Sequence, residues 1–158
     1  MSCKLRITIS TLVNGHLQAA FERFNRELFL KLNPPFPPVK LLRFDGMAVN
    51  DEVHLELNFL LKKEKWISRI TDFSAGKDEI YFVDEGVQLP FFFKSWRHKH
   101  RLIYRENQTE IVDDIRFECK FTFLNCLVYP VLYLQFLYRK PVYRRHFEQD
   151  RELIGGES

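Results

Sequence analysis

The chain has 158 residues, of which 46% are hydrophobic and 28% are charged, and its formal net charge at pH 7 is +3. This length and balance fit one soluble globular domain with a full core, and the charge is too small to indicate a nucleic-acid-binding protein. The three cysteines are too few for a disulfide framework. With no apolar signal segment near the N-terminus, they predict a cytoplasmic location.

The first part of the chain predicts a strand followed by two short helices. Apolar and polar residues alternate over positions 5–10, which is the period of a β-strand. Asn14 is a candidate helix cap, and Asn25 can divide the helical segment that follows. The apolar positions of that segment recur at spacings of four, three and four: Leu17, Phe21, Phe24 and Leu28. The helical pattern must end before the proline-rich segment 33–38, because proline removes backbone donors and restricts the preceding residue.

The middle of the chain predicts a series of strands joined mainly by hairpins. Strand patterns follow in order at residues 39–44, 52–59, 66–73 and 80–83. Residues 62–65 are interpreted as a solvated end, and residues 84–86 as a turn. The strand at 66–73 is out of phase, because Ile70 and Phe73 can face the same side only if the strand contains a β-bulge.

Residues 96–105 and 111–121 carry the most informative pattern. In the first run aromatic and imidazole rings alternate with mostly basic side chains, and the second run alternates again after a short polar break. Two such runs predict a hairpin, and a two-residue turn at Asn107-Gln108 would pair Leu102 with Asp113. The half-buried face then carries His98, His100 and Asp113 among aromatic rings. Buried polar groups need partners, so we expect chemistry on this face.

The segment 121–138 contains no charged residue. Its length is close to the minimum for a membrane span, but Asn125, Pro130 and Gln135 interrupt it. We therefore expect a helix buried within the domain and no stable membrane insertion. The basic cluster at 139–146 is interpreted as a solvated helix face, with contact to anionic lipid headgroups as the alternative.

Pro141 should kink this helix or begin its second half. We expect the helix to continue to Leu153, and residues 155–158 to be a disordered tail, so that residues 1–154 form a single domain. The order of elements predicts an α+β fold in which a curved antiparallel sheet of about seven strands wraps around the C-terminal helix, with two short helices after the first strand. The terminal helix is the element apolar enough to cover one face of the sheet.

Several of these motifs resemble a known superfamily. They are Val83-Asp84, Phe93, Trp96, His98, His100, Thr109, Ile111 and Asp113. The pattern is similar to that of the SRPBCC (START-like, helix-grip) superfamily, and most closely to bacterial ligand-binding members related to polyketide cyclase/dehydrase and lipid-transport proteins. One departure is Phe91-Phe92, where that branch usually has Gly-Pro. The resemblance implies the helix-grip fold, but the function is not implied, because one fold hosts transporters, cyclases, hydrolases and regulators.

On this basis we expect the protein to bind an apolar or amphipathic small molecule, such as a lipid, a polyketide or a quinone-like compound, between the sheet and the terminal helix. The expected lining residues are Phe93, Trp96, His98, His100, Asp113, Phe117, Tyr129, Leu132, Tyr133 and Phe136. Tyrosine hydroxyls on an apolar helix would supply a few polar anchors. The alternative is a solid core in a non-catalytic interaction module whose cavity is vestigial. Homodimerisation is a further hypothesis.

The histidines also allow a chemical interpretation. In a cyclase- or dehydratase-type enzyme, Asp113 would orient His100 toward a bound carbonyl compound. No nucleophile motif or phosphate loop is present, so binding is favoured over catalysis. His98, His100 and Asp113 could also ligate a metal, but cross-strand neighbours give loose geometry. We therefore expect no metal and no cofactor.

Overall fold

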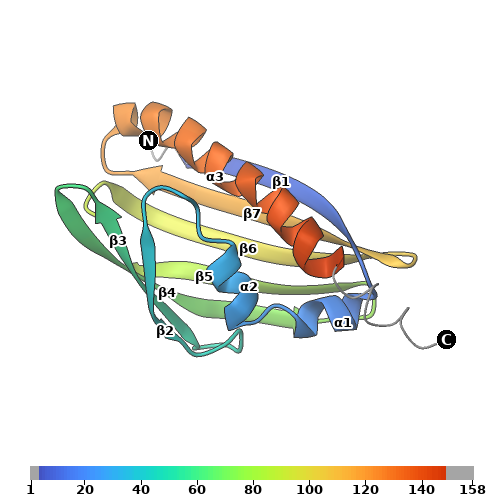
Figure 1. Cartoon of the computed structure of the whole chain (residues 1–158). Helices are drawn as coiled ribbons and strands as arrows, with labels where there is room; N and C mark the ends of the chain where they lie inside the picture. Colours follow the sequence, from blue (N-terminus) through green and yellow to red (C-terminus); the bar gives the residue numbers. More distant parts are fainter. Residues whose placement is uncertain (1–3, 149–158) are drawn as a thin grey trace.

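The computed structural model describes residues 4–148 and shows a seven-stranded antiparallel sheet that curves around one long helix (Figure 1). In chain order the elements are β1 (Leu5–Asn14), α1 (Leu17–Glu22), α2 (Arg26–Lys31), β2 (Val39–Phe44), β3 (Glu52–Phe59), β4 (Lys62–Ala75), β5 (Glu79–Gln88), β6 (Phe93–Arg105), β7 (Gln108–Cys119) and α3 (Thr122–Glu148). The predicted α+β architecture is confirmed. The predicted tail at 155–158 and the expected helix end at Leu153 lie outside the described residues.

The strands β2 to β7 form a meander, and β1 is added beside β7. The strand order is β1-β7-β6-β5-β4-β3-β2, and every neighbouring pair with a recorded register is antiparallel. The strands from β2 to β7 each pair with the next one in sequence, whereas β1 pairs with β7. As a result β1 and β2 are the two edge strands.

The first short helix does not begin at the expected signal, whereas the second begins at Asn25, where a division was expected. Asn14 is not a helix cap, because it is the last residue of β1 and pairs with Gln108 of β7. The chain then turns at Gly15, whose φ of 111° lies in the region that favours glycine. Asn25 does divide the helical segment, and its side chain caps α2 by accepting a hydrogen bond from the Leu28 amide at 3.1 Å.

The hairpin between β6 and β7 turns one residue earlier than predicted. Arg105 pairs with Gln108, so the turn residues are Glu106 and Asn107, and His100 rather than Leu102 lies opposite Asp113. Glu106 has a φ of 54°, and a positive φ in a two-residue turn matches the twist of the strands. The pairing therefore moves by two residues, which leaves every side chain on its predicted face.

The predicted faces of β6 are confirmed. The side chain of His98 is 4% exposed, while that of Arg97 is 38% exposed. The expected bulge in β4 is confirmed as well, since the register shifts between Ile70 and Asp72. Residues 62–65 begin β4, which pairs with β3, and their lysine side chains are exposed as expected. This pairing places Leu60 and Leu61 at the tip of a hairpin.

Helix α3 lies across the concave face of the sheet (Figure 1). It continues through Pro130 and Pro141 as one helix. Leu132, Phe136 and Tyr143 are all buried, so the face of the helix that carries them meets the sheet. Tyr143 packs in an apolar cluster with α1, α2 and β5, whereas Leu132 and Phe136 join a second cluster with β1, β6 and β7. Within the described range, no helix has both the length and the apolarity needed to cross a bilayer.

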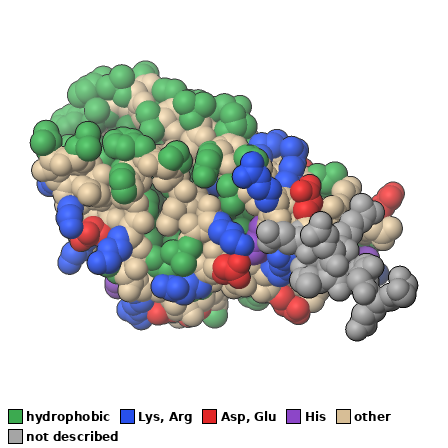
Figure 2. Space-filling view, viewed as in Figure 1, with side chains coloured by type: hydrophobic (Ala, Val, Ile, Leu, Met, Phe, Trp, Pro, Cys, Tyr) green, Lys and Arg blue, Asp and Glu red, His purple; other side chains and the backbone are tan. Residues whose placement is uncertain are grey.

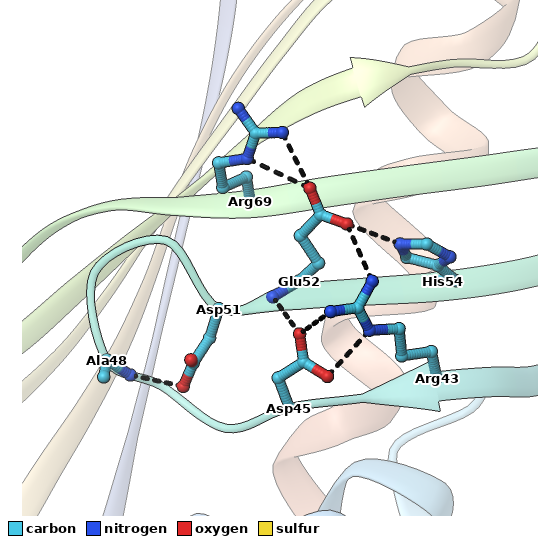
Figure 3. A network of polar contacts seen from close by, with 7 residues as sticks. All are labelled: Arg43, Asp45, Ala48, Asp51, Glu52, His54 and Arg69. Carbon is cyan, nitrogen blue, oxygen red and sulfur yellow. Dashed lines mark hydrogen bonds and ion pairs between the residues drawn. The ribbon is translucent and has the colours of Figure 1, made fainter.

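A network of charged side chains joins the strands β2, β3 and β4 near one edge of the sheet (Figure 3). Glu52 accepts a hydrogen bond from Arg69 at 2.7 Å and another from Arg43 at 3.3 Å, and it pairs with His54 at 2.8 Å. Asp45 accepts from Arg43 at 2.8 Å and from the Glu52 amide at 3.2 Å. The network holds the register of this edge, although exposed pairs of this kind contribute little stability individually.

The fold gives a direct test of where the core lies. Leu102 on β6 is 0% exposed, and Leu12 on β1 is 43% exposed. We expect Leu102→Ala to lower the free energy of unfolding by about 2–5 kcal/mol, because it leaves a cavity in a packed core. The matched change Leu12→Ala should cost about 0.5 kcal/mol or less. Equilibrium urea unfolding measures both, and equal losses in the two variants would contradict this placement of the core.

Candidate functional site

A cavity of about 310 Å³ lies between the concave face of the sheet and α3. Its wall is mainly apolar and is formed by α2, the strands β2 to β6, and α3. Polar lining side chains come from a small set: Asn25, Asn33, Ser68, Asp84, His98, His100, Gln135 and Arg139. This combination of an apolar wall and a few polar groups is typical of small-molecule sites.

The structure places some of the expected lining residues at the cavity and others elsewhere. Those that line it are Phe93, Trp96, His98, His100, Leu132 and Phe136. Phe117 is fully buried in the core, and Tyr129 packs against that core with its ring 6.5 Å from the Phe117 ring. Tyr133 is 41% exposed. It directly follows Leu132 in α3 and so points about 100° away from the cavity face. The expectation of tyrosine anchors in the wall is therefore wrong.

Two Asp–His pairs lie side by side next to the cavity. Asp84, His98 and His100 line it, whereas Asp113, which was expected in the lining, is buried behind them. His98 Nε2 lies 2.8 Å from Asp113 Oδ1, and His100 Nε2 lies 2.9 Å from Asp84 Oδ2. The two imidazole rings are 3.5 Å apart between centroids. The expected pairing is corrected, because Asp113 orients His98, whereas Asp84 orients His100. Although Asp113 lies directly opposite His100 in the ladder, its Oδ1 is 3.7 Å from His100 Nδ1.

Asp84 lines the cavity but was not among the expected site residues, although Val83-Asp84 was one of the motifs of the resemblance. It was interpreted as part of a turn, but β5 extends to Gln88. The signal was present, since Ile80, Phe82 and Asp84 continue the same alternation and share one face. Trp96 Nε1 donates a hydrogen bond to Asp84 Oδ1 at 3.2 Å, so both carboxylate oxygens of Asp84 have partners.

Helix α3 contributes two contacts to Asp113. The Tyr143 hydroxyl donates a hydrogen bond to Asp113 Oδ1 at 3.4 Å, and Arg139 Nη1 lies 3.7 Å from the same oxygen. The Arg139 guanidinium also lies 4.3 Å from the centroid of the Phe136 ring. Arg139 was expected on a solvated face together with His146. Both expectations are wrong, since Arg139 lines the cavity and His146 is 4% exposed.

The surroundings fix the charges of two of these groups. Burial and, to a smaller extent, the charge of the neighbouring His98 lower the pKa of His100 to about 4, against the opposing effect of Asp84. Burial would raise the pKa of Asp113, but the hydrogen bond from His98 and the charges of His98 and Arg139 outweigh it and lower the pKa to about 2. At pH 7 His100 is therefore neutral and Asp113 is ionised.

The neutral state of His100 leaves one nitrogen without a partner. A carboxylate accepts hydrogen bonds, so Nε2 of the neutral ring donates to Asp84 and Nδ1 carries the lone pair. This Nδ1 atom is buried, and it has no hydrogen-bond partner among residues 4–148. The polar cluster beside the cavity therefore holds an acceptor with unused capacity, 3.7 Å from Asp113 Oδ1.

Asp84, His98 and His100 offer ligand atoms that lie within 4.8 Å of one another, which is compact enough for a metal ion. However, Asp84 Oδ2 and His100 Nε2 are already hydrogen bonded to each other at 2.9 Å. A metal ion would have to replace that bond and its proton, and Arg139 adds a positive charge nearby. The absence of a metal stays a prediction, and elemental analysis of the purified protein is the measurement that checks it.

The pKa of His100 predicts a loss of stability in mildly acidic solution. Its ordinary value is 6.5 and its value in the fold is about 4, so below pH 6.5 the unfolded chain binds a proton that the folded chain rejects. Stability should fall between pH 6.5 and 4, by on the order of 3 kcal/mol in total. The contribution of Asp113 is lost only below about pH 4. Urea unfolding from pH 7 to 4 should show a flatter profile for His100→Gln, and parallel profiles would contradict the assignment.

Comparisons with known proteins find similarity in structure alone. No family model and no curated protein sequence matches the chain. Among solved structures, an aromatase/cyclase from Streptomyces sp. R1128 matches with a TM-score of 0.56 at 16% identity, covering 76% of this chain and 71% of that one. A START superfamily protein from Mycobacterium smegmatis matches with a TM-score of 0.66 at 13% identity, covering 91% of this chain and 97% of that one.

A third match is the di-domain aromatase/cyclase of the steffimycin biosynthetic pathway, with a TM-score of 0.70 at 11% identity. It covers 94% of this chain and 52% of the other, so the present chain spans about half the length of that protein. At these identities the likeness concerns the fold and not the activity. The chain therefore shares the predicted helix-grip fold with these aromatase/cyclase and START superfamily structures.

Proposed function

We propose that the protein binds an apolar or amphipathic small molecule in the cavity between the sheet and α3. The observation that carries this proposal is the cavity itself, which has a volume of about 310 Å³ and a mainly apolar wall. A ligand in it would replace water against apolar side chains, which is the main source of binding free energy for such molecules. The occurrence of ligand-processing proteins among the similar structures supports the proposal.

The polar cluster beside the cavity narrows the class of ligand. Asp84 and the lone pair of His100 accept hydrogen bonds, while Arg139 donates them. A ligand with an apolar body and a hydroxyl or keto oxygen at one end matches this arrangement, as a lipid, a polyketide or a quinone-like compound does. A cytoplasmic location, a bacterial source and the absence of nucleic-acid partners remain predictions from the sequence.

Filling the cavity should abolish binding. Leu55 on β3 is half-buried and lines the cavity, whereas Glu56 on the same strand points to the other face. We expect the wild-type chain to bind the fluorescent probe N-phenyl-1-naphthylamine, and Leu55→Trp to weaken that binding at least tenfold. The matched variant Glu56→Trp should bind as the wild type does. If neither the wild type nor Glu56→Trp binds the probe, the cavity is vestigial and the interaction module is the better account.

The two Asp–His pairs favour a second candidate function. Proton transfer to and from an enolisable carbonyl compound requires a base inside a dry cavity, and His100 is neutral there at pH 7. A cyclase- or dehydratase-type enzyme would use this arrangement. The enzyme would then rely on His98, His100 and Asp113, with Asp84 as the group that orients His100.

Deuterium exchange tests this candidate without knowledge of the natural substrate. If the pairs are catalytic, the protein should accelerate exchange of the methyl protons of an aryl methyl ketone in deuterium oxide at least tenfold over buffer, as followed by NMR. His98→Gln and His100→Gln should each return the rate to that of buffer. His54→Gln is the matched control, because His54 pairs with Glu52 outside the cavity lining. An acceleration that survives in both site variants would exclude the pairs as the catalytic groups.

A further inference from the structure

We propose that the end of the molecule at the β3–β4 hairpin tip docks on the surface of an anionic lipid bilayer, and that the cavity receives its ligand there. The second part rests on the proposed ligand-binding function, whereas the docking itself does not. We use the name apolar end for the five residues that carry the proposal: Leu60, Leu61, Phe91, Phe121 and Phe123.

The residues of the apolar end are unusually exposed for their type. Leu60 is 88% exposed and Leu61 is 101% exposed at the hairpin tip, and Phe91, Phe121 and Phe123 are 60%, 61% and 64% exposed. Hydrophobic atoms gather over the upper left of the molecule in Figure 2, in the region where α3 begins in Figure 1. Contiguous apolar surface of this kind marks an interaction site.

These residues come from three chain segments that contact one another. The Lys62 ammonium lies 4.8 Å from the centroid of the Phe91 ring, which joins the β3–β4 hairpin to the loop before β6. The Lys120 amide donates a hydrogen bond to the Phe92 carbonyl at 2.9 Å, which joins that loop to the start of α3. The rings of Phe121 and Phe123 stack at 6.0 Å. The apolar end is therefore one surface.

This surface continues into the opening of the cavity. Phe123, Leu127 and Val131 recur every four residues and so share one face of α3. Leu127 is 63% exposed and Val131 is 50% exposed, and both also line the cavity. An apolar molecule that leaves a bilayer at this end would thus move along apolar side chains into the cavity.

The charges around the apolar end favour anionic lipid over a second copy of the chain. The side chains of Lys62, Lys63 and Lys94 are 61%, 66% and 57% exposed, and Lys65 and Lys120 are exposed as well. The carboxylates that pair with the first three are less exposed, at 14%, 27% and 8%. The outermost charges are therefore positive. They would repel one another across a symmetric dimer, but they match a negatively charged bilayer.

Vesicle flotation tests the docking directly. Full-length wild-type protein should float with vesicles of 70% phosphatidylcholine and 30% phosphatidylglycerol, and binding should weaken with added salt. The double variant Leu60→Glu/Leu61→Glu should lose at least tenfold in binding. Val49→Glu is the matched control, since Val49 is 50% exposed in the β2–β3 connection, at the opposite end of β3. Because all three positions are exposed, thermal unfolding should be nearly unchanged.

A variant with fewer lysines separates the electrostatic part of the vesicle binding from the apolar part. Lys63→Gln/Lys65→Gln should weaken binding to anionic vesicles by about fivefold for each lysine and leave the weak binding to pure phosphatidylcholine unchanged. Light scattering is run on each protein in the absence of vesicles. The docking proposal is overturned if the wild type does not float with the vesicles. If the wild type also forms a dimer that Leu60→Glu/Leu61→Glu dissociates, the apolar end is a surface for self-association.

Probe binding keeps the failure of this proposal distinct from failure of the proposed function. Leu60→Glu/Leu61→Glu should bind N-phenyl-1-naphthylamine in solution with wild-type affinity, because neither residue lines the cavity. Flotation without probe binding in the wild type would remove the cavity function and leave the docking standing. Probe binding without flotation would remove the docking proposal and leave the cavity function standing.

Discussion

The buried carboxylate of Asp113 is the interaction on which the arrangement of sheet and helix depends. It is 1% exposed and is contacted by His98 from the adjacent strand and by Tyr143 and Arg139 from α3. An ionised carboxylate leaves water at a cost of several kcal/mol unless partners replace the water. Since two of the three partners come from the helix, α3 must lie at this place and with this rotation for the charge to be satisfied.

That requirement explains why a polar cluster lies beside the cavity while the cavity wall is mainly apolar. The rotation that brings Tyr143 over the sheet also turns Leu132 and Phe136 inward. Tyr133, in contrast, is turned outward. The polar groups of the cavity therefore gather where the helix is held by charge. Toward the start of α3 the side chains that meet the cavity are apolar and increasingly exposed, with Leu127 as the clearest case.

The buried and exposed faces of single strands were predicted well from the sequence. The contacts between side chains of different strands and helices were not. The faces of β6 follow from a strict period of two, which a shift of the hairpin by two residues leaves unchanged. The aspartate that orients His100 was assigned wrongly. The choice between Asp84 and Asp113 depends on distances between neighbouring strands, which the pattern of one strand does not contain. Asp84 was missed because the predicted strand ended at Val83, whereas β5 continues to Gln88. Arg139 was missed because a basic run is usually solvated. The alternation of Ile80, Phe82 and Asp84 could have corrected the first error, whereas the place of Arg139 follows only from the packing of α3.

The pairing of β1 with β7 has a consequence for how the chain folds as it is synthesised. Arg6 of β1 forms an ion pair with Asp114 of β7 at 2.8 Å, across 108 positions of sequence. Until β7 leaves the ribosome, the first strand has no partner, and its apolar face has no cover. At about 5–20 residues per second this interval lasts roughly 5–20 s. Such long-range pairing also slows folding of the released chain, so β1 stays exposed to wrong pairing until β7 has been made.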